Sequence, residues 1–434
     1  MQIVDNRLPR ILSWVLAGVF AVVPVWTFAA VSLGHFVGYY EVWRVLPSVV
    51  IFLVAVVAVI AALLWQRQLI KSFLRDKITL LILAFALVML ISAILGEATL
   101  RAKLAGLAMD GRFLVAFLAA RWLAFSEPKL WRSFLDFAPK FLVIVGVGLS
   151  ILGLIQVTWL PKEFLAMFGY SLDGVAPYVS IDHGETLRAF ATMAGPNNYA
   201  NYLLITLFAA VFLIIRGKGR WRRLAIMSVP IIASGLAVSS SRAAWLATIV
   251  ALVTYFVLNH KISRKVIVGS AIGVVVIGLV GLALFEVPAF RENILHIRDD
   301  RDSAVVTSND AHLDALVDGV DQVVETPLGC GVGCAGPASY YSVRGIISEN
   351  YYLQIAQEYG FIGIALFAWI LTLILLRLRQ DKEDHLAQIW LAAGIGLLFA
   401  ALFAHTFADE AVSVTWFMLA GGLIGASRPR AVRP

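Results

Sequence analysis

The sequence predicts an all-α integral membrane protein with about twelve transmembrane helices. Of its 434 residues, 60% are hydrophobic and 15% are charged, and the mean hydropathy is +0.85. Soluble domains contain about 45–50% apolar and about 25% charged residues, so this excess points to burial in lipid. The composition argues against a disordered chain, a disulfide scaffold and a basic nucleic-acid-binding domain. The lipid bilayer is therefore an expected partner, and nucleic acid is not.

Twelve apolar segments are close to the roughly 20 residues that cross the hydrocarbon core. They lie at 11–33, 45–65, 77–95, 107–125, 138–160, 195–215, 224–239, 243–259, 265–286, 353–376, 386–405 and 410–426. The fourth contains Arg112 and Arg121, which we expect to snorkel to the two interfaces. The first is too long for a cleavable signal region and follows Arg7 and Arg10, so we expect an uncleaved anchor.

Lysine and arginine are concentrated in alternate connections. With the N-terminus inside, 23 of the 35 Lys and Arg residues fall in cytoplasmic segments. The positive-inside rule then favours an even number of spans with both termini in the cytoplasm. This divides the chain into nine helices over 1–286, an extracytoplasmic loop over 287–352 and three helices over 353–434. A second long external loop covers 161–194.

The 287–352 loop has readable local structure. Residues 309–325 place apolar side chains on one stripe and acidic ones mostly opposite, which predicts an amphipathic helix packed on the bundle. Four glycines between 327 and 337 indicate tight turns and close backbone approach. Cys330 and Cys334, in the same stretch, fit either a small disulfide ring or two free thiols. Ser348 is expected to cap the next helix, and Gly360 to kink or cap it.

Two arginines lie near the predicted outer interface, where a charge is costly and needs a reason. Arg242 lies in a very short turn between the seventh and eighth spans, and Arg188 precedes the sixth. Each can bind an anion or reach a lipid phosphate. Asn197 and Asn198 follow a Gly-Pro pair that should distort the start of the sixth span. These asparagines can bind a sugar or cap the helix.

The other chemically interesting residues also lie in external segments. Glu349 opens the helix leading into the tenth span, where a carboxylate often only complements the helix dipole. His405, Asp409 and Glu410 are expected to form a solvated turn, with a proton relay as the alternative. The sequence has no metal-ligand cluster, P-loop, dinucleotide fingerprint or nucleophile elbow, so we expect no metal and no cofactor. Arginines would then have to meet an anionic substrate directly.

The order of the motifs resembles the O-antigen ligase and O-antigen polymerase superfamily of bacterial membrane glycosyltransferases. The motifs are Arg188 with Gly195-Pro196-Asn197, then Ser241-Arg242, then residues 327–333, and finally 349–354 with 358–363. The most specific part is 309–367. The resemblance implies a GT-C-like membrane fold and a glycan donor linked to undecaprenyl diphosphate. It also implies metal-independent transfer on the outer face of the bacterial cytoplasmic membrane.

The resemblance further implies roles for particular residues. Arg188 and Arg242 would hold the diphosphate leaving group, and the 287–352 loop would be catalytic. Gly331 and Gly333 would add backbone donors. In the family a His-Asn pair is thought to supply the base, but this chain has Glu349 followed by asparagine. Glu349 then either replaces the histidine as general base or orients a different acceptor.

Asn350, Asn197 and Asn198 are expected to contact substrate. His312 is assigned there too, in a region where family ligases often carry an arginine, although a lone loop histidine is by default a surface residue. The acceptor is open: ligases use a lipid A-core sugar or a protein, and polymerases use another lipid-linked repeat. A transporter or flippase of lipid-linked sugars is the alternative from another class. Transporter sites usually lie near the bilayer midplane, whereas the candidates here cluster at the outer interface.

Overall fold

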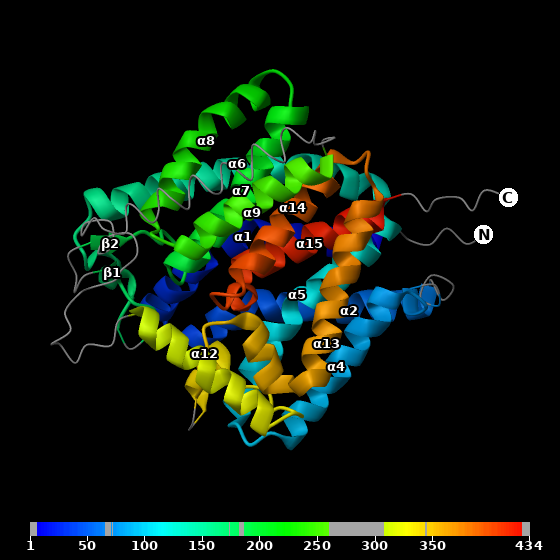
Figure 1. Ribbon diagram of the computed structural model, residues 1–434. Coiled ribbons are helices and arrows are strands. Elements are labelled where there is room, and N and C mark those ends of the chain that lie inside the picture. Colours follow the sequence, from blue (N-terminus) through cyan, green and yellow to red (C-terminus); the bar gives the residue numbers. More distant parts are fainter. Residues whose placement is uncertain are drawn as a thin grey trace.

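The computed structural model describes residues 7–65, 71, 73–172, 174–181, 186–259, 308–342 and 345–427. Within them the protein is almost wholly helical (Figure 1). The long helices are α1 Arg7–Val37, α2 Tyr40–Trp65, α4 Lys77–Leu95, α5 Leu100–Ser126, α6 Pro128–Thr158, α7 Pro196–Arg216, α8 Arg220–Val238, α9 Arg242–Asn259, α13 Tyr351–Gln380, α14 His385–Ala400 and α15 Glu410–Ala426. Each coincides with a predicted span. The predicted span at 265–286 lies outside the described residues.

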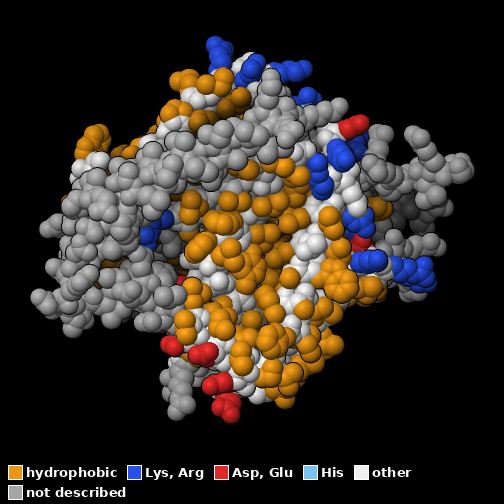
Figure 2. Space-filling view, viewed as in Figure 1, with side chains coloured by type: hydrophobic (Ala, Val, Ile, Leu, Met, Phe, Trp, Pro, Cys, Tyr) orange, Lys and Arg blue, Asp and Glu red, His pale blue; other side chains and the backbone are white. Residues whose placement is uncertain are grey.

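The protein is an all-α membrane protein. In the described ranges, 8 helices are long and apolar enough to cross a membrane, and α14 and α15 are shorter apolar helices. A broad hydrophobic area occupies the middle of the face shown in Figure 2, with most basic side chains along its upper and right edges and acidic ones at its lower edge. This distribution matches a lipid-facing belt between two polar ends. The total of twelve spans remains a prediction.

The centre of the bundle is formed by α7, α14 and α15, most of whose residues are buried. The Trp390 indole donates to the carbonyl of Trp416 at 2.9 Å, and the Trp416 indole donates to that of Trp390 at 3.1 Å. Gly421 and Gly425 let α15 lie directly against the α5 backbone. Small residues at helix contacts are typical of membrane bundles, where backbones approach closely.

The prediction that Arg112 and Arg121 snorkel to the interfaces is wrong. The Arg112 side chain is buried and lies 3.8 Å from the Glu410 carboxylate, while Arg121 pairs with Asp76 at 2.6 Å. The reason is the position of α5, which packs among α15, α2 and α1 rather than at the lipid boundary. Both guanidinium groups are therefore compensated by protein partners.

The connections predicted to be external gather at one end of the bundle. They contain η1 Phe164–Phe168, the antiparallel hairpin of β1 Val179–Ile181 and β2 Thr186–Arg188, α12 Ser308–Glu325, η4 Gly336–Tyr341 and η5 Thr406–Ala408. A disulfide joins Cys330 and Cys334, which decides between the two alternatives for these cysteines.

Helix α12 confirms the predicted helix but corrects its packing face. Val323 is buried, whereas Val317, Val320 and Val324 are each more than half exposed. The contact with α13 is instead centred on Gly319, whose backbone lies against the Leu353 side chain. The close approach that a glycine permits thus decides the orientation of the helix.

Candidate active site

Arg188 lies at the end of β2 and joins two helix ends. Its Nε donates to the carbonyl of Ser239, just after α8, at 3.0 Å, and its Nη2 donates to Oδ1 of Asn197, near the start of α7, at 3.1 Å. The next residue, Ala189, donates its N–H to the Val238 carbonyl at 2.9 Å. These bonds fix Arg188 in a half-buried position where helix ends meet.

The structure brings Arg188, Arg242 and Glu349 together from three separate segments. Burial and the neighbouring Arg242 charge lower the pKa of Arg188 to about 10, and the Glu349 charge acts in the opposite direction. Arg188 therefore remains charged at neutral pH. Two guanidinium groups and one carboxylate at the same end of the bundle are an arrangement able to bind an anion and to accept a proton.

Helix starts add to the positive field at this place. Helix α7 begins after Gly195, which has no side chain to cap it, and α9 begins at Arg242 itself. The first N–H groups of a helix have no partner within that helix and favour anions. Asn197 does not cap α7, since its Oδ1 accepts from Arg188. Asn198 is half-buried one residue later.

Backbone strain is concentrated around these residues. Ala191, Ser240 and Glu349 have φ values of 49°, 51° and 49°. A left-handed conformation costs a non-glycine residue about 1–2 kcal/mol and persists only where its surroundings impose it. Gln156, at the end of α6, is one such restraint, because its Oε1 accepts from the N–H groups of Phe190 and Ala191 at 3.0 and 2.9 Å.

Glu349 is exposed and directly precedes the cap of α13. The cap is Asn350, whose Oδ1 accepts from the Leu353 N–H at 3.0 Å and whose Nδ2 donates to the Leu402 carbonyl at 3.0 Å. The expectation that Ser348 caps the helix is wrong, because Ser348 is buried and donates to Oε1 of Gln357 at 2.9 Å. These contacts of Asn350 anchor the backbone next to Glu349.

A buried carboxyl pair lies beneath the start of α13. Asp110 of α5 accepts from the Tyr351 and Tyr359 hydroxyls, each at 2.8 Å, and Glu358 Oε1 accepts from the Gly333 N–H at 2.9 Å. The Glu358 carboxyl group lies next to that of Asp110, and both residues are completely buried. Two buried carboxyl groups in contact are more stable when they share one proton than when both are ionised. This network ties α13 to α5.

The glycine-rich segment completes the kinked helix. Gly360 has φ 66° inside α13, as its sequence position predicts, and the kink frees carbonyl groups. The N–H of Cys330 donates to the Gln357 carbonyl at 2.8 Å, and that of Gly331 to the Glu358 carbonyl at 3.3 Å. With the Gly333 N–H bonded to Glu358 as well, these donors are used inside the protein. We therefore do not assign Gly331 or Gly333 to phosphate binding.

The last external connection is not the solvated turn expected. His405 Nδ1 lies 2.7 Å from Gln354 Oε1, and burial lowers the His405 pKa to about 4, so its imidazole is neutral. Asp409 caps α15 by accepting from the Val412 N–H at 2.9 Å. The reason is that α5, α7, α13 and α15 all pack on η5. His312 lies in α12, but its side chain is outside the described part of the structure, so its role stays a prediction.

Residues 227–368 match a family model described as O-antigen ligase. This segment, about a third of the chain, is similar to the O-antigen ligase family. It contains Arg242, Glu349 and the glycine-rich segment and ends within α13, while Arg188 and Asn197 lie before it. Comparison with curated proteins gives no match for the chain. The family match supports glycosyl transfer of the O-antigen ligase type in a multi-pass membrane protein of bacteria.

Sequence reasoning missed several residues that position the site. Gln156, Asp110 and Glu358 each make contacts with segments far away in the sequence. A carboxylate in the middle of an apolar span is the one signal that could have indicated Asp110, because such a group needs a partner. Among the described residues, no group of three His, Cys, Asp or Glu side chains could hold a metal ion.

Proposed function

We propose that the protein transfers a glycan from undecaprenyl diphosphate to an acceptor hydroxyl at the outer face of the cytoplasmic membrane. The observation that carries this proposal is the convergence of Arg188, Arg242 and Glu349 at one end of the bundle. The two guanidinium groups match a diphosphate, and the carboxylate matches a hydroxyl that must lose its proton.

In the proposed reaction, the donor diphosphate binds at Arg188, Arg242 and the start of α7. The acceptor oxygen attacks the anomeric carbon from the side opposite the diphosphate, so the configuration at that carbon inverts. The bond between this carbon and the phosphate oxygen breaks, and its electron pair leaves with the diphosphate. The arginines stabilise the charge that develops there without a metal. The acceptor proton moves to the Glu349 carboxylate.

Arg188 and Arg242 differ in how cleanly they can be tested. Arg188 holds the ends of α7 and α8 together, so its removal disturbs structure as well as charge. Arg242→Ala is therefore the more informative variant. Arg101→Ala is the control at the same end of the bundle, because Arg101 is an exposed arginine that pairs with Glu41 and lies outside the proposed site.

The test is transfer by purified protein in nanodiscs, with a native lipid-linked glycan extract and mass spectrometry of the products. Losing one preorganised hydrogen-bond donor should lower the transfer rate of Arg242→Ala about 10²–10³-fold. Arg101→Ala should transfer at the wild-type rate. A glycan on a new acceptor indicates a ligase, and a ladder of longer lipid-linked glycans indicates a polymerase. Equal rates for wild type and Arg242→Ala would contradict the proposal. No product from an intact donor and a full acceptor extract would favour the transporter alternative.

A further inference from the structure

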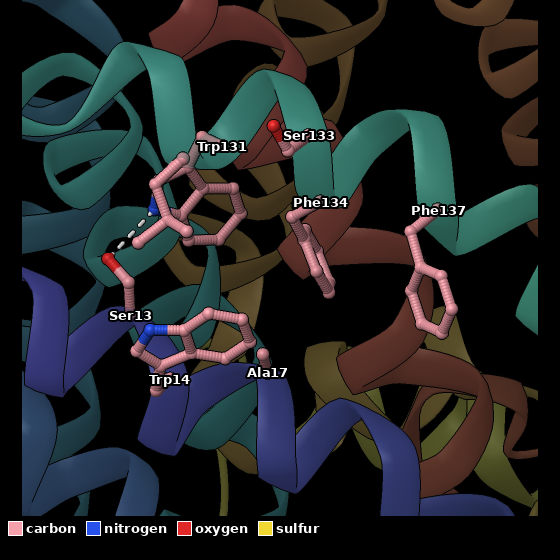
Figure 3. Close-up of a pocket in the computed structure, with 8 residues that line it drawn as sticks. Ser13, Trp14, Ala17, Trp131, Ser133, Phe134 and Phe137 are labelled. Atoms are coloured by element: carbon pink, nitrogen blue, oxygen red, sulfur yellow. Dashed lines mark hydrogen bonds between the residues drawn. The ribbon is translucent and has the colours of Figure 1, made fainter.

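A groove lined by aromatic side chains lies between α1 and α6, at the end of the bundle opposite Arg188. Trp131, Phe134 and Phe137 project from successive turns of α6 toward α1, where Trp14 and the small Ala17 face them (Figure 3). The groove has a volume of about 260 Å³. The Trp131 indole donates to Ser13 Oγ at 3.1 Å, which fixes the groove wall.

The groove opens toward the lipid. Trp14 is 66% exposed and Phe137 is 54% exposed, on helices that are long and apolar enough to span the membrane. A hydrocarbon chain of the surrounding bilayer can therefore enter from the side. Burying such a chain against aromatic rings is favoured in the same way as other apolar burial.

A polar hollow adjoins this groove and shares Trp14 and Leu130 with it. It has a volume of about 520 Å³ and is lined by Arg10, Glu127 and Lys129. Arg10 Nε pairs with Glu127 Oε2 at 3.2 Å. The other carboxylate oxygen, Glu127 Oε1, is buried and has no hydrogen-bond partner within the described ranges. A buried carboxylate oxygen without a donor is costly and indicates that something else supplies one.

We infer that this two-part groove binds a phospholipid whose headgroup carries both a phosphate and a primary ammonium. One acyl chain lies along Trp14 and Phe137, and the phosphate lies between Arg10 and Lys129. The ammonium donates to Glu127 Oε1. A headgroup of this chemistry offers an anion to the two basic side chains and an N–H donor to Glu127 Oε1. The site lies at the end of the bundle predicted to face the cytoplasm and does not depend on the proposed transfer reaction.

The headgroup preference can be measured by native mass spectrometry with equal amounts of three lipids that have the same acyl chains. Phosphatidylethanolamine has N–H donors, phosphatidylcholine has a quaternary ammonium without N–H, and phosphatidylglycerol has no ammonium. A charge-assisted hydrogen bond should give phosphatidylethanolamine a preference of roughly five- to tenfold. Glu127→Gln should abolish this preference over phosphatidylglycerol, and Glu383→Gln, in the exposed turn between α13 and α14, should leave it unchanged.

The apolar part is tested by Ala17→Phe, which fills the groove, and by Trp14→Ala, which removes an exposed wall without touching the core. Both should lower occupancy by all three lipids, while Ile144→Phe, on an exposed part of α6, should not. A folded Glu127→Gln protein that keeps the preference for phosphatidylethanolamine would overturn the headgroup assignment. Unchanged occupancy in both groove variants would overturn the site itself.

Discussion

The buried pair of Asp110 and Glu358 allows a sharp prediction about how the site is held. Glu358 Oε1 accepts from the Gly333 N–H at 2.9 Å, and its carboxyl group lies next to that of Asp110. If the proton between the carboxyl groups resides on Glu358, glutamine can replace it with every bond kept. The glutamine carbonyl accepts from Gly333, and its amide donates to Asp110. We therefore expect Glu358→Gln to be nearly as stable and as active as wild type.

Leucine at the same position should behave differently. Glu358→Leu leaves the buried Gly333 N–H without an acceptor and Asp110 without its carboxyl partner. Each buried donor or acceptor left without a partner costs about 1–3 kcal/mol. A loss of roughly 2–5 kcal/mol is therefore expected. Because Tyr351 and Tyr359 share Asp110, the start of α13 should shift and displace the neighbouring Glu349.

The assay is thermal unfolding in detergent, followed by size-exclusion chromatography, with transfer activity measured on the same samples. Glu358→Leu should lower the apparent melting temperature by several degrees and reduce transfer. Glu325→Leu, which changes an exposed carboxylate on α12, is the control and should do neither. If glutamine proves as harmful as leucine, no proton lies on Glu358, and the explanation of this network is incorrect.

Three further predictions follow from the packing and charges around the site. The His405 pKa is about 4 in the folded protein and about 6.5 in the unfolded chain. The neutral imidazole therefore contributes fully to the free energy of unfolding above pH 6.5, and this contribution is lost as the pH falls toward 4. The loss is roughly 3 kcal/mol. His405→Gln should therefore show a smaller fall in melting temperature between pH 7 and 4.5 than the wild type or the control variant His385→Gln. Equal falls in all three proteins would show that His405 is not responsible. Gly96→Ala should lower the melting temperature, since its Cβ would lie 2.7 Å from the Gly331 Cα. Gly18→Ala should not, because nothing lies within 4 Å of the added Cβ. An unchanged melting temperature for Gly96→Ala would mean that α4 and the glycine-rich segment are not in close contact. Ala191→Gly should leave stability in thermal unfolding nearly unchanged, because relief of a φ of 49° offsets the loss of a buried methyl group and the greater freedom of the unfolded chain. A loss of about 1.5 kcal/mol or more would contradict the strain.

The helices were predictable because hydropathy and the positive-inside rule act over whole segments. Eleven predicted spans coincide with described helices, and Arg188, Arg242 and Glu349 meet as their motif order suggested. Each of these signals needs only the local sequence and the alternation of the two membrane sides.

The partners of individual side chains were less accessible to sequence reasoning. Arg112 was expected at an interface but pairs with Glu410, which is about 300 residues away in the chain. Likewise, the N–H groups of Gly331 and Gly333 were expected to bind phosphate, yet the first donates to the Glu358 carbonyl next to the kink at Gly360 and the second to the Glu358 carboxyl group. Such contacts depend on the mutual orientation of helices, for which local periodicity contains no information.

Glu349 is proposed to take the proton of the acceptor hydroxyl, and replacing it with glutamine and with histidine tests this role most directly. Both variants keep a polar side chain at a position with φ 49°, where histidine is tolerated better than most residues. In the nanodisc assay, Glu349→Gln should lose about 10²–10⁴-fold in rate, because it has no base. Glu349→His should retain measurable transfer that rises with pH through the imidazole titration. Full activity in Glu349→Gln, in a protein whose Arg242→Ala variant is inactive, would contradict this role for Glu349.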